Sequence, residues 1–111
     1  MNGMDDLHLR DPGKVRGWKR LLLAKGSEIA ARLEQLLSGK EVDLSGGIPP
    51  PLLPADDPEL RLRRFLEQID RGIKRAATDR FGRCAVCGDA LAAVLLDEAP
   101  WTERCGAHAA A

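Results

Sequence analysis

The sequence predicts a mainly α protein, in which two long helices pair as an antiparallel coiled-coil hairpin and a small C-terminal unit follows. Two stretches carry apolar residues at a helical, heptad-like period. A segment rich in glycine and proline separates them and excludes a regular element there. Three cysteines gather near the C-terminal end at spacings typical of metal ligands. A chain of 111 residues is often marginal without such a staple, so a metal site fits its size.

The first helix is expected over about residues 12–38, after a loose arm at residues 1–10. Asp11 can cap the free backbone N–H groups, and Pro12 at the first helical position gives up a donor that the helix does not use. The apolar stripe recurs at spacings of three, four and seven, and comprises Val15, Trp18, Leu22, Ile29, Leu33 and Leu36. Ser38 and Gly39 then supply a C-terminal stop.

The second helix is expected over about residues 58–80, after a long connection at residues 39–57. Asp57-Pro58 repeats the start signal of the first helix. The second stripe has spacings of four and three, and comprises Leu62, Leu66, Ile69, Ile73 and Ala76. Because each stripe alone would be exposed, the two helices are expected to cover one another as an antiparallel hairpin. Packing in an ordinary helical bundle or through dimerisation is the alternative.

Matching the two stripes gives the hairpin a register. Antiparallel pairing places Leu36 with Leu62, Ile29 with Ile69 and Leu22 with Ala76. Trp18 then lies near Phe81, beside the C-terminal unit. We therefore divide the chain into an arm and helical hairpin at residues 1–80 and a C-terminal domain at residues 81–111.

Charge is distributed unevenly along a chain whose formal net charge is zero. Residues 14–40 and residues 61–83 each carry a net charge of +5, whereas residues 41–60 carry −5 and residues 84–111 carry −3. The neutral total excludes a generic polyanion binder. Solvated helix faces and helix caps are one explanation of the pattern; an acidic connection that meets a positive partner is the other.

The C-terminal domain contains two metal half-sites. Cys84 and Cys87 form the first, Cys105 and His108 form the second, and seventeen residues lie between Cys87 and Cys105. Two such turns can close a tetrahedron around one zinc ion, which predicts a small zinc finger with one structural Zn2+. A site of three cysteines completed by water, in place of His108, is the alternative for the fourth ligand.

Other chemistry at these cysteines is disfavoured. A redox pair of Cys84 and Cys87 would be expected within a βαβ pattern, which the sequence lacks. No pair of carboxylates and no nucleophile–base set accompanies the site, so we expect no enzyme. His8 lies alone in a polar arm and is given no role.

Three segments carry a resemblance to a known family. Residues 81–88 read Phe-Gly-Arg-Cys-Ala-Val-Cys-Gly, and residues 96–101 read Leu-Asp-Glu-Ala-Pro-Trp. Cys105 then follows Cys87 after a gap of seventeen residues. This combination resembles the DksA/TraR family of zinc-finger proteins, and residues 18–24 are similar to the first coiled-coil helix of that family. The resemblance implies a transcription regulator that binds RNA polymerase directly and makes no direct sequence-specific contact with DNA.

The family also implies a site at the end of the hairpin that enters the secondary channel of the polymerase. By resemblance the acidic residues of this tip are Asp56, Asp57 and Glu59. Leu60 and Leu62 stand where the tip motif of the family has a second aspartate and an alanine. A zinc-stabilised adaptor that holds some other protein is therefore the rival function. A nucleic-acid-binding ribbon is a further rival, disfavoured by the net charge of −3 on the finger.

Compartment and assembly follow from simpler features. The first fifteen residues contain three aspartates and no apolar run, unlike a secretory signal peptide. Cysteines at metal-ligand spacing favour a reducing compartment, so we expect a cytoplasmic protein. The apolar runs are too short to span a bilayer, and the intramolecular hairpin predicts a monomer with no membrane partner.

Overall fold

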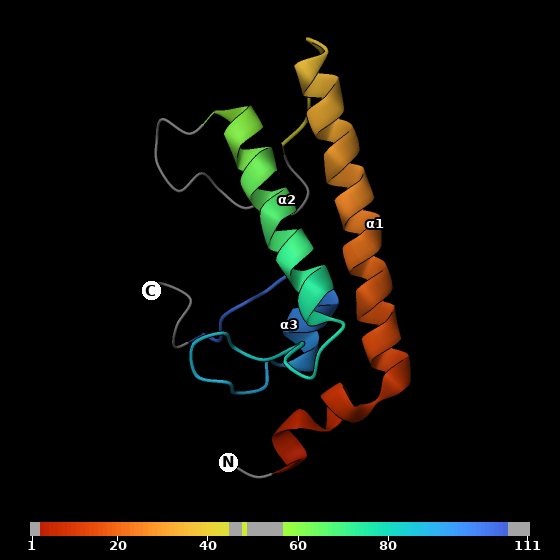
Figure 1. Ribbon diagram of the computed structural model, residues 1–111, viewed down its shortest axis with the longest axis vertical. Coiled ribbons are helices and arrows are strands. Elements are labelled where there is room, and N and C mark those ends of the chain that lie inside the picture. The colour runs from red at the N-terminus through yellow and green to blue at the C-terminus, as the bar shows by residue number, and fades with distance from the viewer. Residues whose placement is uncertain (1–2, 45–47, 49–56, 107–111) are drawn as a thin grey trace.

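The computed structural model describes residues 3–44, residue 48 and residues 57–106. Within these ranges the chain is mainly helical and contains no strand, in agreement with the expected class. Two long helices are packed together, and a short helix with its loops lies at one end of the pair (Figure 1). The elements are η1 (Gly3–Arg10), α1 (Pro12–Leu37), α2 (Pro58–Arg75) and α3 (Ala93–Glu98). None of these helices is long and apolar enough to cross a bilayer.

Both predicted helix starts are confirmed by their capping hydrogen bonds. The Asp11 carboxylate accepts from the N–H of Gly13 at 2.9 Å and from that of Lys14 at 3.3 Å. Asp57 accepts from the N–H of Leu60 at 2.8 Å. Each cap satisfies a donor that has no partner within its helix, which fixes the residue at which the helix begins.

The core between α1 and α2 is built from the two predicted stripes. Its fully buried members include Leu22, Ile29, Leu62, Phe65 and Ile69. Phe65 belongs to this core although the predicted stripe omits it.

Glycines let the two helices approach closely. A Cβ at Gly26 would lie 3.4 Å from Cγ2 of Ile69, and one at Gly72 would lie 3.0 Å from Cδ2 of Leu22. Larger side chains at these positions would therefore push α1 and α2 apart.

The second helix ends earlier than the sequence pattern predicts. α2 stops at Arg75, whereas the expected end was about residue 80. Both the N–H and the hydroxyl of Thr78 donate to the Arg75 carbonyl at 2.8 Å, which closes a turn in place of a further helical turn. The chain then places Phe81 in the core, where its ring lies 6.3 Å from that of Trp18, which confirms the predicted proximity of these two residues. The close approaches of the helices, Gly26 with Ile69 and Gly72 with Leu22, lie about one turn from the pairs that the register predicted.

The described part of the connection folds back along the helices. The Arg32 guanidinium donates to the Asp43 carbonyl at 3.1 Å. Leu44 packs against the core, and Ile48 is buried in it. The beginning of the connection is therefore drawn toward the helices by its apolar side chains.

The prediction of a loose arm at residues 1–10 is wrong for residues 3–10, the part of that range that the structure describes. Residues 3–10 form η1, and the Asp6 carboxylate accepts from Arg83 at 2.6 Å. His8 donates through Nε2 to the Leu91 carbonyl at 2.6 Å and meets the Trp18 ring edge-on. Arg83 and Leu91 lie more than seventy positions along the chain from their partners, and Trp18 belongs to the next helix, α1. A local sequence pattern cannot reveal contacts of this kind.

Candidate metal centre

Cys84 and Cys87 are presented by a tight turn. The N–H of Gly88 donates to the Cys84 carbonyl at 2.9 Å, and Gly88 has a φ of 77°, a conformation that side chains disfavour. The N–H of Cys84 donates to the Asp89 carbonyl at 2.8 Å. These two bonds hold the segment between the cysteines in one conformation.

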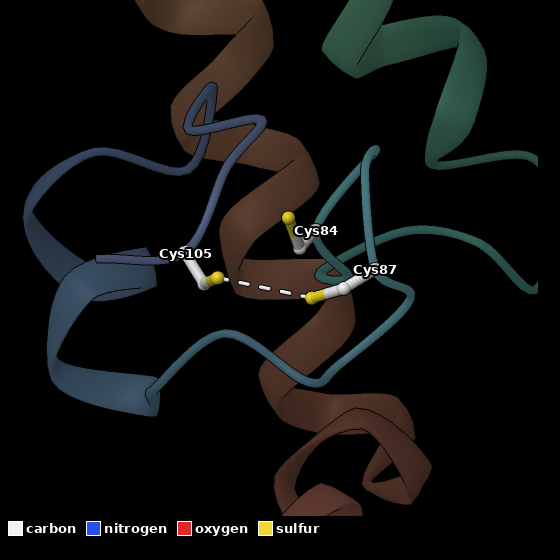
Figure 2. Close-up of side chains that lie close together, drawn as sticks. All are labelled: Cys84, Cys87 and Cys105. Atoms are coloured by element: carbon white, nitrogen blue, oxygen red, sulfur yellow. Dashed lines mark hydrogen bonds between the residues drawn. The ribbon is translucent and has the colours of Figure 1, made fainter. Parts of the chain in front are cut away.

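The second half of the site is tied to the first through the backbone. The N–H of Ala85 donates to the Glu103 carbonyl at 2.7 Å, which brings the segment carrying Cys105 beside the turn. The three thiols consequently converge on one point from two loops (Figure 2).

The spacing of the sulfur atoms suits a metal ion. All three Sγ atoms lie within 4.8 Å of one another, and those of Cys87 and Cys105 are 3.8 Å apart (Figure 2). Thiolates bound to a tetrahedral ion at about 2.3 Å are separated by about 3.8 Å, the edge of that tetrahedron. A disulfide would need about 2.05 Å. The cluster of Cys84, Cys87 and Cys105 could therefore hold a metal ion.

The electrostatics of the first cysteine favour the thiolate that a metal requires. Burial raises the pKa of Cys84, but the backbone N–H groups of Cys105, Cys87 and Val86 outweigh burial and lower the pKa to about 6. The Val86 N–H is 3.4 Å from the sulfur. Only the deprotonated thiol is a metal ligand, so these donors prepare one of the three ligands.

The pKa of Cys87 is shifted in the opposite direction from that of Cys84. The backbone N–H of Asp89 lowers the pKa of Cys87, but partial desolvation, the thiols of Cys84 and Cys105 and the negative charge of Asp89 together raise the pKa to about 11. Neighbouring thiols resist a second negative charge. A bound cation would remove that resistance, because its charge inverts the local preference.

Three of the four predicted metal ligands are thus brought together. His108 lies outside the described residues, as does Asp56 of the predicted tip. The other two tip acids make local contacts: Asp57 caps α2, and Glu59 pairs with Arg63 at 3.0 Å.

The groups that fasten the cysteine loops and α3 to the two long helices are not evident from the sequence. The Glu103 carboxylate accepts from Arg71 at 2.6 Å and from Arg75 at 3.2 Å, which ties the loop of Cys105 to α2. Trp18 donates through its indole N–H to the Asp97 carboxylate at 2.8 Å, which ties α3 to α1. A single sequence gives no signal for pairs so far apart along the chain.

No family model, curated protein or solved structure matches this chain. The resemblance to the DksA/TraR family therefore rests on the quoted residues of this sequence. Several of them are buried in the structure: Phe81, Cys84, Leu96 and Pro100.

Proposed function

We propose that the C-terminal domain is a structural zinc finger that holds one Zn2+ through Cys84, Cys87, Cys105 and His108. The 3.8 Å separation of two thiols and the N–H donors at Cys84 support the three cysteine ligands, and His108 is assigned from its position three residues after Cys105. Four protein ligands leave no open position for a substrate, so the metal has a structural role and we assign no enzymatic activity.

The helix pair is proposed to be an antiparallel coiled-coil hairpin that the finger holds at its base. Two close approaches support it, Gly26 with Ile69 and Leu22 with Gly72. The residue number falls on one helix as it rises on the other, which is the order of an antiparallel pair. The finger would then fix the orientation of the hairpin through Glu103.

The function that we propose is regulation of transcription by direct binding to RNA polymerase, in the cytoplasm, without sequence-specific binding to DNA. One observation carries the proposal: the residues that resemble the DksA/TraR family include buried residues, among them Leu96, Pro100 and Phe81, whose ring lies beside that of Trp18 on α1. The resemblance thus extends to the parts that orient the hairpin. The acidic connection, with a net charge of −5 over residues 41–60, would meet a positive or metal-containing site on the polymerase.

A zinc-stabilised adaptor for another protein is the second candidate. It is favoured by the contacts at the tip, because Asp57 and Glu59 already have local partners and Leu62 is fully buried. Under this reading the acids stabilise α2, and the hairpin uses another surface.

The two candidates are separated by measuring binding of the zinc-loaded protein to purified RNA polymerase at several salt concentrations. Asp57→Asn keeps the capping oxygen but removes the charge, since asparagine caps helices about as well as aspartate. Asp11→Asn makes the same change at the cap of α1 and serves as the matched control. The regulator proposal expects binding that is weakened several-fold by Asp57→Asn, most strongly at low salt, and unchanged by Asp11→Asn.

Equal effects of the two substitutions would reduce Asp57 to a helix cap. Absence of polymerase binding at every salt concentration would remove the regulator proposal and leave the adaptor. Elemental analysis of the same preparations, purified without chelator, checks the metal independently: well under one zinc per chain would refute the finger.

A further inference from the structure

Helix α1 carries a second apolar stripe beside the one that packs on α2. Its positions recur at spacings of four, three, four, three and four, and are Lys19, Leu23, Gly26, Ala30, Leu33 and Leu37. This is the spacing of a coiled-coil seam, displaced by one position from the core stripe. Leu23 and Leu37 are each 57% exposed, and Ala30 is exposed as well. Gly26 and Leu33 are shared with the face that packs on α2, whereas Leu23, Ala30 and Leu37 form an exposed flank beside that face.

The other flank of α1 is the one that the rest of the protein covers. The Lys25 ammonium lies 5.9 Å from the centre of the Trp101 ring of the finger. Arg32, two turns further along the same flank, binds the Asp43 carbonyl of the connection. On a helix with 3.6 residues per turn, Lys25 and Arg32 lie on the opposite side of the core stripe from Leu23 and Ala30. Among the described residues, these contacts lie on the opposite flank from Leu23, Ala30 and Leu37, which are exposed.

The second stripe is complementary to itself when it is reversed. An antiparallel pairing centred near residue 28 matches Leu23 with Leu33 of a second copy and Gly26 with Ala30 of that copy. Leu23 then meets Leu33, which is half-buried against the core, on both sides of a crossing made of small residues. Glycine and alanine at the crossing permit the close approach that helix packing at about 8–10 Å requires.

The flanking charges select the same orientation. Arg20 and Glu34 are exposed, lie one position after Lys19 and Leu33, and have no side-chain partner within the ranges that the structure describes. In the antiparallel pair, Arg20 lies beside the partner's Glu34, and the contact occurs twice by symmetry. In a parallel pair, Arg20 would instead lie level with Arg20 of the second copy, and Glu34 with Glu34 of that copy, so like charges would face one another. Flanking charges of this kind set the orientation of coiled coils.

An open cavity lies at one end of the stripe. It measures about 110 Å³ and is lined by Lys19, Leu22, Leu23, Ile73 and Ala76, so most of its wall is apolar. The same antiparallel register brings the partner's Leu37 to the level of Lys19. That side chain would enter the cavity, and it would bury the exposed edge of Leu23.

We propose that the second stripe of α1 is the interface of an antiparallel homodimer, in place of the monomer expected from the sequence. The occupant of the stripe is a second copy of this chain, because Leu23 with Leu33, Gly26 with Ala30 and the flanking charges pair on reversal, and Leu37 meets the cavity beside Lys19. The dimer does not depend on RNA polymerase binding, since the tip and the finger lie outside the stripe.

The test is the oligomeric state of the full-length, zinc-loaded protein, measured by sedimentation equilibrium over a wide concentration range. Leu23→Glu is expected to raise the dimer dissociation constant by on the order of 100-fold, because one substitution places two carboxylates in an apolar interface. Leu21→Glu is the matched control: Leu21 is 45% exposed on the same helix but lies toward the finger, so the dimer should persist. Helix content by circular dichroism checks that each variant is folded, and Leu37→Glu replaces Leu23→Glu if that variant is not.

Charge reversal tests the orientation. Arg20→Glu is expected to weaken the dimer by about 10-fold, and adding Glu34→Arg should restore it, because the pair is rebuilt with opposite sign. A protein that is monomeric at all concentrations would overturn the proposal, as would a dimer that ignores Leu23→Glu or is lost equally with Leu21→Glu. A monomer that binds only a helix of a different protein through this stripe would also overturn it.

Discussion

The carboxylate of Glu103 is the clearest place to test how the segment that carries Cys105 is fastened to α2. It accepts hydrogen bonds from Arg71 at 2.6 Å and from Arg75 at 3.2 Å, while its own carbonyl accepts from Ala85 beside the first cysteine. We expect Glu103→Gln to destabilise the zinc-loaded protein, because the amide keeps the shape of the side chain but loses the charge and one acceptor. Glu98, an exposed acid on α3, supplies the control Glu98→Gln.

The magnitude follows from the exposure of the partners. Arg71 is 53% exposed, so its ion pair contributes about 0.2–1 kcal/mol, as at a protein surface. Arg75 and Glu103 are about one-fifth exposed, so their charge-assisted bond is worth about 1.5–3 kcal/mol before the remaining amide acceptor is considered. We therefore expect a loss of about 1–2 kcal/mol in the free energy of unfolding, which corresponds to a midpoint shift on the order of 0.5–1 M urea.

The pH dependence of this loss has a defined sign. Burial raises the pKa of Glu103, but the guanidinium groups of Arg71 and Arg75 outweigh burial and hold the pKa below its ordinary value of 4.5. A depressed pKa contributes stability above the unfolded pKa, and the contribution is lost as pH falls through the folded pKa. The difference between wild type and Glu103→Gln should therefore stay constant from about pH 8 to about pH 5. A difference below about 0.3 kcal/mol, or an equal loss in Glu98→Gln, would refute the anchoring role.

Two further predictions concern the metal and the glycines. Cys105→Ser should abolish retention of zinc by elemental analysis and unfold the finger, since structural zinc supplies on the order of 10 kcal/mol of apparent binding energy; a variant that keeps one zinc per chain would exclude Cys105 as a ligand. Gly82→Ala should lower the free energy of unfolding by about 1–3 kcal/mol, because Gly82 has a φ of 76° and its new Cβ would collide with Leu9. Gly17→Ala, with nothing within 4 Å of its Cβ, should instead raise it by about 0.5–1 kcal/mol in the same denaturation assay. A lower free energy of unfolding in both variants would contradict the expected difference between Gly82 and Gly17.

The positions of the helix starts could be predicted because their causes are local. Asp11 and Asp57 each precede a proline, and the capping oxygen needs only the next few residues to find its donors. The end of α2 comes earlier than predicted, because its cause is not local. The apolar period continues through Ala76, but Thr78 closes a turn onto Arg75 and Phe81 packs beside Trp18 of α1.

The N-terminal arm shows the same limit. A short polar segment with an isolated histidine has no period, so the sequence predicted a loose arm. Asp6 and His8 are instead held by hydrogen bonds to Arg83 and to the Leu91 carbonyl, which lie near the cysteine loops. Hydrogen bonding to Arg83 also holds the pKa of Asp6 below its ordinary value, although burial opposes the shift.

For the candidate metal site, the sequence by itself determined the three thiols, because two ligands separated by two residues must share a turn and a second half-site needs a connection of limited length. It also determined a mainly helical chain with two long helices, since helical period and caps are properties of neighbouring residues. Only the tertiary structure decided how the cysteine loops and α3 are held, because Glu103 with Arg71 and Trp18 with Asp97 join residues that are distant along the chain. Such pairs form only where tertiary packing has already brought α3 and the segment of Cys105 beside the two long helices, and no spacing in the sequence encodes that distance.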